Sequence, residues 1–184
     1  FTGDADSTLS SEKIRLMMLD EALNIYNEQH KNAQVHLTPA QKAVFGQTNM
    51  FGVPFTELPN LLSMTPNERD KFQGDMANPK VGIPINDNKD YNGNYNDFQV
   101  WLKAIYNVAQ TINREQGEKL TAEERANLSN LYTALMRKGQ GIAIKADKDT
   151  PFTTVQRVFD NLQTMKLNKF SLMTALKSED EPTQ

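Results

Sequence analysis

Residues 141–175 carry the pattern that most restricts the fold, because the hydrophobic period changes twice within this short stretch. Residues 141–146 alternate between apolar and other side chains, which predicts a short strand with Ile142 and Ile144 on one face. A helical apolar pattern follows, and residues 169–174 indicate a second strand. Strands joined by a helix normally lie parallel, so the stretch predicts a βαβ unit.

The helix of this unit has recognisable ends in the sequence. The turn Asp147-Lys148-Asp149 precedes it, and Thr150 is expected to cap it. Pro151 suits the first helical position, and Asn168 is expected to end the helix. The inward side chains are expected at helical spacing, at Phe152, Val155, Phe159 and Leu162.

Several helices are predicted upstream of this unit. A first helix is expected over residues 10–31 with Ser10 as its N-cap. Capping boxes at Thr38, Thr65 and Thr121 each predict a further helix start. The apolar face of the first helix is expected at Ile14, Met18, Ala22 and Ile25, and that of the helix after Thr121 at Leu128, Leu131 and Leu135.

A long helix is expected over residues 96–116, with Asn96 as its N-cap. The sole tryptophan, Trp101, is interpreted as a core anchor. Residues 51–54 contain a glycine and a proline, which predict a packed corner before a short helix. The apolar stripe of the long helix is expected at Phe98, Trp101, Leu102, Ile105 and Val108.

These elements predict an α+β fold in which a small sheet is covered by helices and helix outweighs strand. The length of 184 residues, 38% of them hydrophobic, fits one domain. We expect that domain over 1–177, with an expanded helical insertion at about 86–140 and a disordered tail at 178–184.

Composition excludes several classes of function. The chain has no cysteine, so a thiol nucleophile, a thiolate metal site and a disulfide are impossible. Its net charge is −3 and its cations are scattered, so nucleic acid is not an expected partner. No apolar run is long enough to span a bilayer, and the start at Phe1 suggests a fragment of a longer product.

No catalytic constellation is found in the sequence. His30 and His36 are the only imidazoles, and both are interpreted as solvated loop histidines. The acidic residues Asp147 and Asp149 lie in a turn with no feature that would raise a carboxyl pKa. The chain is therefore predicted to have no catalytic residue and no cofactor, and not to be an enzyme.

One loop can be aligned with a calcium-binding EF-hand loop. Oxygen-bearing side chains fall at loop positions one, three, five and nine, which are Asn88, Asp90, Asn92 and Asn96, and Gly93 takes the position of the sharp turn. The weak calcium candidates are Asn88, Asp90, Asn92 and Asn94. The first position is not aspartate, and the last is Gln99 instead of a bidentate glutamate. A polar turn that leads into a helix is the favoured interpretation, with calcium binding as the alternative.

The run from Ile142 to Phe152 resembles the signature of the ExbD/TolR family, in which a strand ends in a basic residue and an aspartate before a helix opens. The helix over 155–163 and the strand over 167–174 continue this resemblance. Shorter matches that resemble a Bacteroidetes-type branch of the family lie, in order, at 37–42, 51–54, 82–84 and 96–98 with Trp101.

The resemblance implies the periplasmic domain of a single-pass inner-membrane protein, the small subunit of a proton-driven energy-transducing complex. An upstream membrane helix would carry the proton-accepting aspartate, and the partners would be an ExbB-like channel subunit and a TonB-like transducer. A homodimer is also expected. The domain would work through contacts, and the candidate partner-binding residues are the strand edge and turn at Ile142, Ile144, Lys145, Asp147 and Asp149.

Two other hypotheses from different classes stay open. The first is a TolR-like domain that binds peptidoglycan and maintains the envelope. The second is a calcium-binding adaptor centred on the asparagine-rich loop. An uncharacterised hydrolase ranks last, because the reacting groups are missing.

Overall fold

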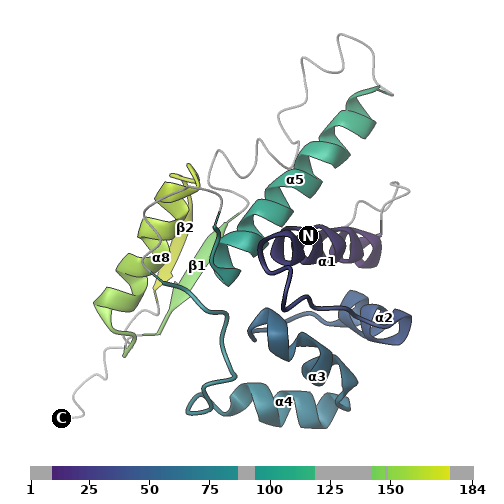
Figure 1. Cartoon of the computed structure of the whole chain (residues 1–184). Helices are drawn as coiled ribbons and strands as arrows, with labels where there is room; N and C mark the ends of the chain where they lie inside the picture. Colours follow the sequence, from purple (N-terminus) through teal and green to yellow (C-terminus); the bar gives the residue numbers. More distant parts are fainter. Residues whose placement is uncertain (1–9, 87–93, 119–141, 148, 175–184) are drawn as a thin grey trace, which may run out of the picture.

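The computed structural model describes residues 10–86, 94–118, 142–147 and 149–174, and these residues form a mostly helical α+β structure with one small sheet (Figure 1). The elements are α1 (Ser11–Gln29), α2 (Pro39–Gln47), the 3-10 helix η1 (Phe55–Glu57), α3 (Leu58–Ser63), α4 (Pro66–Gly74), α5 (Asp97–Glu118), β1 (Ala143–Ala146), α8 (Phe152–Thr164) and β2 (Ser171–Thr174). The predicted α+β class, with more helix than strand and one small sheet, is confirmed for the described residues.

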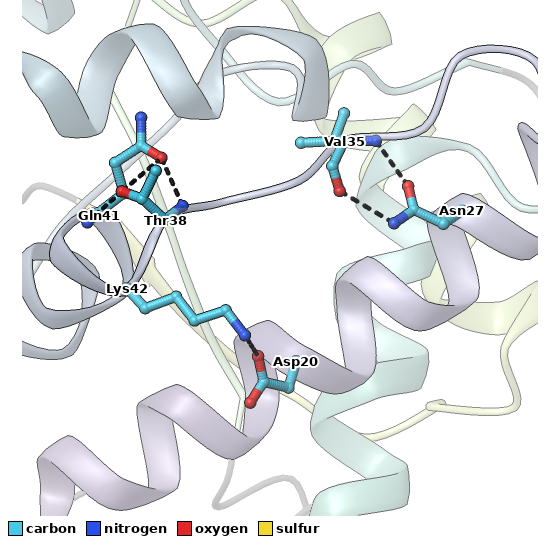
Figure 2. Close-up of polar contacts among 6 residues, drawn as sticks. All are labelled: Asp20, Asn27, Val35, Thr38, Gln41 and Lys42. Atoms are coloured by element: carbon cyan, nitrogen blue, oxygen red, sulfur yellow. Dashed lines mark hydrogen bonds and ion pairs between the residues drawn. The ribbon is translucent and has the colours of Figure 1, made fainter.

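Helix starts follow the predicted capping chemistry. Ser10 Oγ accepts the Lys13 N–H at the start of α1. Thr38 and Gln41 form a reciprocal capping box at α2, in which Thr38 Oγ1 accepts the Gln41 N–H at 3.2 Å and Gln41 Oε1 accepts the Thr38 N–H at 2.8 Å (Figure 2). Thr65 begins α4 with the same kind of box. The box predicted at Thr121 lies outside the described residues.

A network of polar contacts connects α1, α2 and the segment between them (Figure 2). The Asn27 amide makes two hydrogen bonds with the backbone of Val35, one through its Nδ2–H at 2.9 Å and one through its Oδ1 at 2.8 Å. Lys42 pairs with Asp20 on α1 at 2.6 Å. These contacts set how α2 lies against α1.

Helix α5 takes part in all three apolar clusters of the described residues. The first joins α5 to α1, α2 and α3, and the second joins it to the β1–α8–β2 segment. The third joins Val108 and Ile112 to Ile14 on α1. The predicted stripe therefore covers only part of the buried surface, because Val100 and Ala104 are also fully buried.

Trp101 is a core anchor, as predicted. Its ring stacks on Phe55 with centroids 5.0 Å apart and lies parallel to Phe45 at 5.9 Å. The predicted corner at 51–54 is packed, because Val53 is fully buried. Gly82 closes this corner by donating its N–H to the Gly52 carbonyl at 2.7 Å, with a φ of +97° that favours glycine.

The C-terminal segment has the predicted order of strand, helix and strand. The two strands pair in parallel, with Ile144 opposite Leu172 and Lys145 opposite Met173. Both strands are shorter than predicted, since β1 begins at Ala143 and β2 at Ser171.

Three details of α8 differ from the prediction. Pro151, not Thr150, is the N-cap, and no side chain caps this end, because the proline ring has no oxygen that could accept a backbone N–H. The helix ends at Thr164 and not at Asn168, because the backbone reverses at Lys166 with a φ of 59°. Phe152 was expected to be inward, but it is 74% exposed because it lies at the first helical position, ahead of the buried face.

Within the described residues, no helix is both long and apolar enough to cross a membrane. The predicted tail at 178–184, and the part of the predicted insertion from 119 to 140, lie outside the described residues.

Candidate interaction surface at the strand edge

The two isoleucines of the predicted contact strand face inward. Ile142 and Ile144 are half-buried and pack against a cluster that includes Leu102 on α5 and Leu162 on α8. They hold β1 in place through apolar burial, and a partner would not contact their side chains first. Strand alternation turns these two side chains toward the core, and their part in a partner contact stays a prediction.

The opposite face of the sheet is open to solvent. Ala143 and Lys145 on β1 are exposed, and Met173 beside Lys145 is 52% exposed. This face, comprising Ala143, Lys145, Ser171 and Met173, is called the open sheet face below. It combines an apolar thioether with a cationic side chain.

The outer backbone edge of β1 is also available among the described residues, because β1 pairs only with β2 there. The Ile142 carbonyl accepts the Ser171 N–H at 2.9 Å, so the backbone of residue 142 is directed toward β2. In a parallel pair alternate residues bond to the same neighbour. The N–H and C=O groups of Ala143 and Lys145 are therefore directed away from β2.

The turn after β1 is held by local bonds. Asp147 Oδ1 accepts the Asp149 N–H at 3.2 Å, and the Asp147 carbonyl accepts the Thr150 N–H at 3.0 Å. Both aspartates are exposed. This geometry is an Asx turn that connects the strand to α8, and it provides exposed negative charge beside the edge.

Sequence reasoning missed three exposed apolar side chains in this segment. Leu172 and Met173 are adjacent on β2, and Phe152 begins α8. For Met173 a signal was present in the sequence, since adjacent residues of a strand face opposite sides and a one-sided sheet cannot bury both Leu172 and Met173. Figure 1 shows β1, β2 and α8 lying at the side of α5 away from α2.

A buried amide joins this segment to the rest of the molecule. Asn161 on α8 is 1% exposed, and its Nδ2 group donates to the Asn86 carbonyl at 2.9 Å and the Arg157 carbonyl at 2.8 Å. Its Oδ1 accepts the Asn96 side-chain N–H at 2.8 Å. Asn96 also caps α5 as predicted, since its Oδ1 accepts the Gln99 N–H at 2.9 Å.

His30 does not lie free in a loop, contrary to the prediction. It is the C-cap of α1 and half-buried, and its ring stacks on Tyr26 with centroids 4.1 Å apart. Its Nδ1 lies 2.9 Å from the Tyr26 carbonyl oxygen, which can only accept, so Nδ1 carries the proton. The ring is half-buried because it stacks on the last turn of the same helix, a short-range contact that sequence reasoning did not consider. His36 is exposed, as predicted.

The carboxyl of Asp97 lies near this ring at the start of α5. Burial raises its pKa, while the hydrogen bond from the Phe55 N–H at 3.0 Å and the nearby His30 lower it by smaller amounts. Burial, and then the Asp97 charge, raise the pKa of Tyr26. The cluster contains an acid and an imidazole, and its Tyr26 ring stacks on Phe55 in the packed core.

The calcium hypothesis concerns mostly residues outside the described part, namely Asn88, Asp90 and Asn92, while Asn94 is described and exposed. Gln99, the last position of the proposed loop, is fully buried, and its Oε1 accepts the Asn96 N–H at 3.2 Å. That oxygen is therefore directed at a helix cap. Among the described residues, no group of three or more acidic or histidine side chains is arranged to hold a metal ion.

No protein-family model, curated protein or solved structure matches this chain. The resemblance to ExbD and TolR therefore rests on the sequence motifs and stays a prediction.

Proposed function

We propose that this chain is the periplasmic domain of the small subunit of a proton-driven energy-transducing complex of the ExbB–ExbD–TonB type, and that it acts through protein contacts. The observation that carries the proposal is the outer edge of β1, where the backbone of Ala143 and Lys145 is directed away from β2. This edge lies within residues 141–175, whose sequence motifs resemble the ExbD/TolR family.

The edge supports a specific mode of contact. An extended segment of a TonB-like transducer would add to β1 as a further strand, and main-chain hydrogen bonds would supply affinity. The open sheet face, through Met173 and the Lys145 cation, would select side chains of the added strand. In this proposal the proton chemistry belongs to the membrane helix and the ExbB-like subunit, and the domain transmits the resulting movement.

Photo-crosslinking in intact membranes tests this contact. A photoreactive residue at Lys145 of the full-length protein is expected to crosslink to the transducer. The matched control is Met76, which is 84% exposed and follows α4, outside the β1–α8–β2 segment. Equal yields from both positions, or crosslinks only from Met76, would refute the contact surface.

A backbone test separates strand addition from side-chain contact. Lys145→Pro removes the N–H that faces the free edge, and an edge strand tolerates proline there. Lys145→Ala removes only the side chain. If strand addition is correct, the proline variant folds but loses the transducer crosslink from a photoreactive residue at Met173, while the alanine variant keeps most of it.

The peptidoglycan alternative makes a different prediction. A TolR-like domain would sediment with purified cell-wall sacculi, and Lys145→Pro would not change the retained fraction. Retention on sacculi together with no transducer crosslink at Lys145 would favour the alternative over the proposal.

A further inference from the structure

An apolar groove of about 340 Å³ lies between α1, α5 and the segment that follows α2. It is distinct from the open sheet face. Such a volume is at the lower end of the range for small-molecule sites. Its lining is mainly apolar and aromatic and includes Arg15, Phe45, Thr48, Asn49, Phe51 and Trp101.

Aromatic rings form much of the groove wall. Phe51 packs at a tilt against Trp101, with centroids 4.8 Å apart, and Phe45 packs against Phe51 at 5.0 Å. These ring contacts fix the shape of the wall before any ligand arrives. A ligand with an apolar body would gain about 25 cal/mol for each Å² of apolar surface that it buries there.

Arg15 is the one charged side chain that lines this groove. Its Nη1–H donates to the Gly46 carbonyl at 3.1 Å, which anchors the guanidinium beside the end of α2. Among the described residues, Lys42 and Lys80 form ion pairs with carboxylates, whereas Arg15 forms none. The groove therefore offers an anchored cation whose other N–H groups suit a carboxylate.

The other polar side chains that line the groove are neutral, and the Glu12 carboxylate, which lies near Gly46 outside the groove lining, forms no ion pair with Arg15 among the described residues. Thr48 Oγ1 donates to the Val44 carbonyl at 2.8 Å and accepts an N–H of Arg69 at 3.0 Å. Asn49 is neutral. The charge that complements an aromatic groove with one cation is a single negative charge on an apolar body.

We propose that this groove binds a small amphipathic carboxylate of the free fatty-acid class. The acyl chain lies along the aromatic wall, and the carboxylate pairs with the Arg15 guanidinium. Neutral molecules of the same length lose the ion pair, and cationic ones are repelled by Arg15.

The chain itself provides the readout, because its sole tryptophan, Trp101, lines the groove. Dodecanoate, kept below its micelle-forming concentration, is titrated into the folded domain, and the Trp101 emission is followed. A saturable change is expected, with weaker binding of dodecanol and weakest binding of dodecyltrimethylammonium. The absence of a saturable change with dodecanoate would overturn the proposal.

Charge-matched variants locate the carboxylate. Arg15→Met is expected to weaken dodecanoate binding by about tenfold and to leave dodecanol binding nearly unchanged. The control is Lys13→Met, which removes one positive charge from an exposed position on the same helix outside the groove lining. Circular dichroism confirms that both variants are folded. Equal weakening by the two variants, or none by Arg15→Met, would overturn the assignment.

The ligand source is tested with peptides. A short peptide that ends in phenylalanine with a free carboxylate carries the same two chemical features, and its amide lacks the charge. Tighter binding of the free peptide than of dodecanoate would assign the groove to a protein C-terminus and overturn the fatty-acid proposal. This assay uses the domain alone, so its result is independent of the crosslinking at Lys145.

Discussion

The carboxyl of Asp97 is partly buried, and this burial makes its ionisation unfavourable in the folded state. Burial is the largest influence on its pKa and raises it, while the Phe55 N–H and His30 offset part of that rise. The folded pKa therefore lies above the unfolded one. Between these two pKa values the folded state binds more protons, so the contribution of Asp97 to stability rises as the pH falls.

Replacement of Asp97 by asparagine tests this sign. Asparagine keeps an oxygen that can accept the Phe55 N–H, and it removes the buried charge. We expect Asp97→Asn to be at least as stable as the natural protein at pH 7, with an advantage that shrinks as the pH falls through the raised pKa. Denaturant unfolding at pH 7 and pH 4 measures both differences. A variant that is less stable at pH 7, and relatively more stable at pH 4, would contradict the argument.

At the scale of elements, α8 is tied to the start of α5 by the buried amide of Asn161. Its Nδ2 group satisfies two carbonyls, those of Asn86 and Arg157, and its Oδ1 accepts from Asn96. Loss of a buried partner leaves such groups without hydrogen bonds, which costs about 1–3 kcal/mol. The amide therefore orients α8 as well as stabilising it.

We expect Asn161→Ala to lower the free energy of unfolding by about 1–3 kcal/mol and to increase hydrogen exchange in α8. Asn161→Asp should be worse at neutral pH, because it faces two carbonyls with a buried negative charge. The control is Asn60→Ala, which removes an exposed amide on α3 that donates to Glu57 Oε2. A control that costs as much as Asn161→Ala would show that the cost is not specific to the buried junction.

The elements that could be predicted from the sequence are those specified by local chemistry. The caps at Ser10, Thr38 and Asn96 need only residues three positions away, so they were predicted correctly. Packing between distant segments could not be predicted in this way. Burial at helix ends was also predicted wrongly, since His30 stacks on Tyr26 four residues earlier and Phe152 is exposed at the first position of α8.

For the candidate surface, too, the sequence predicted the local pattern but not the packing. Alternation correctly placed Ile142 and Ile144 on one face of β1, but it could not show which face the core would occupy. The structure turns those two side chains toward the core, while Lys145, Asp147 and Asp149 are exposed. The apolar side chain of Met173 belongs to the open sheet face through the strand register, which no local pattern specifies.

At the scale of the whole molecule, α5 takes part in three apolar clusters, two of them shared with α1 and one shared with the β1–α8–β2 segment. Trp101 lies in the cluster with α1 to α3, and Leu102 lies in the cluster with the strands and α8. Two adjacent residues of this helix therefore pack into two different clusters. If α5 couples the two sides, the clusters cannot unfold separately, and the described part of the chain behaves as one cooperative unit.

Leu162→Ala tests this coupling from the far side. Leu162 is 1% exposed in the cluster with the strands, and its truncation should cost about 2–5 kcal/mol. We expect the midpoint of denaturant unfolding to fall equally when followed by Trp101 fluorescence and by far-ultraviolet circular dichroism. Leu61→Ala, in the other cluster, is the matched comparison and should shift both signals in the same way. An unchanged Trp101 transition in Leu162→Ala would mean that the strand segment unfolds independently, because loss of the second cluster would then leave the packing around Trp101 intact.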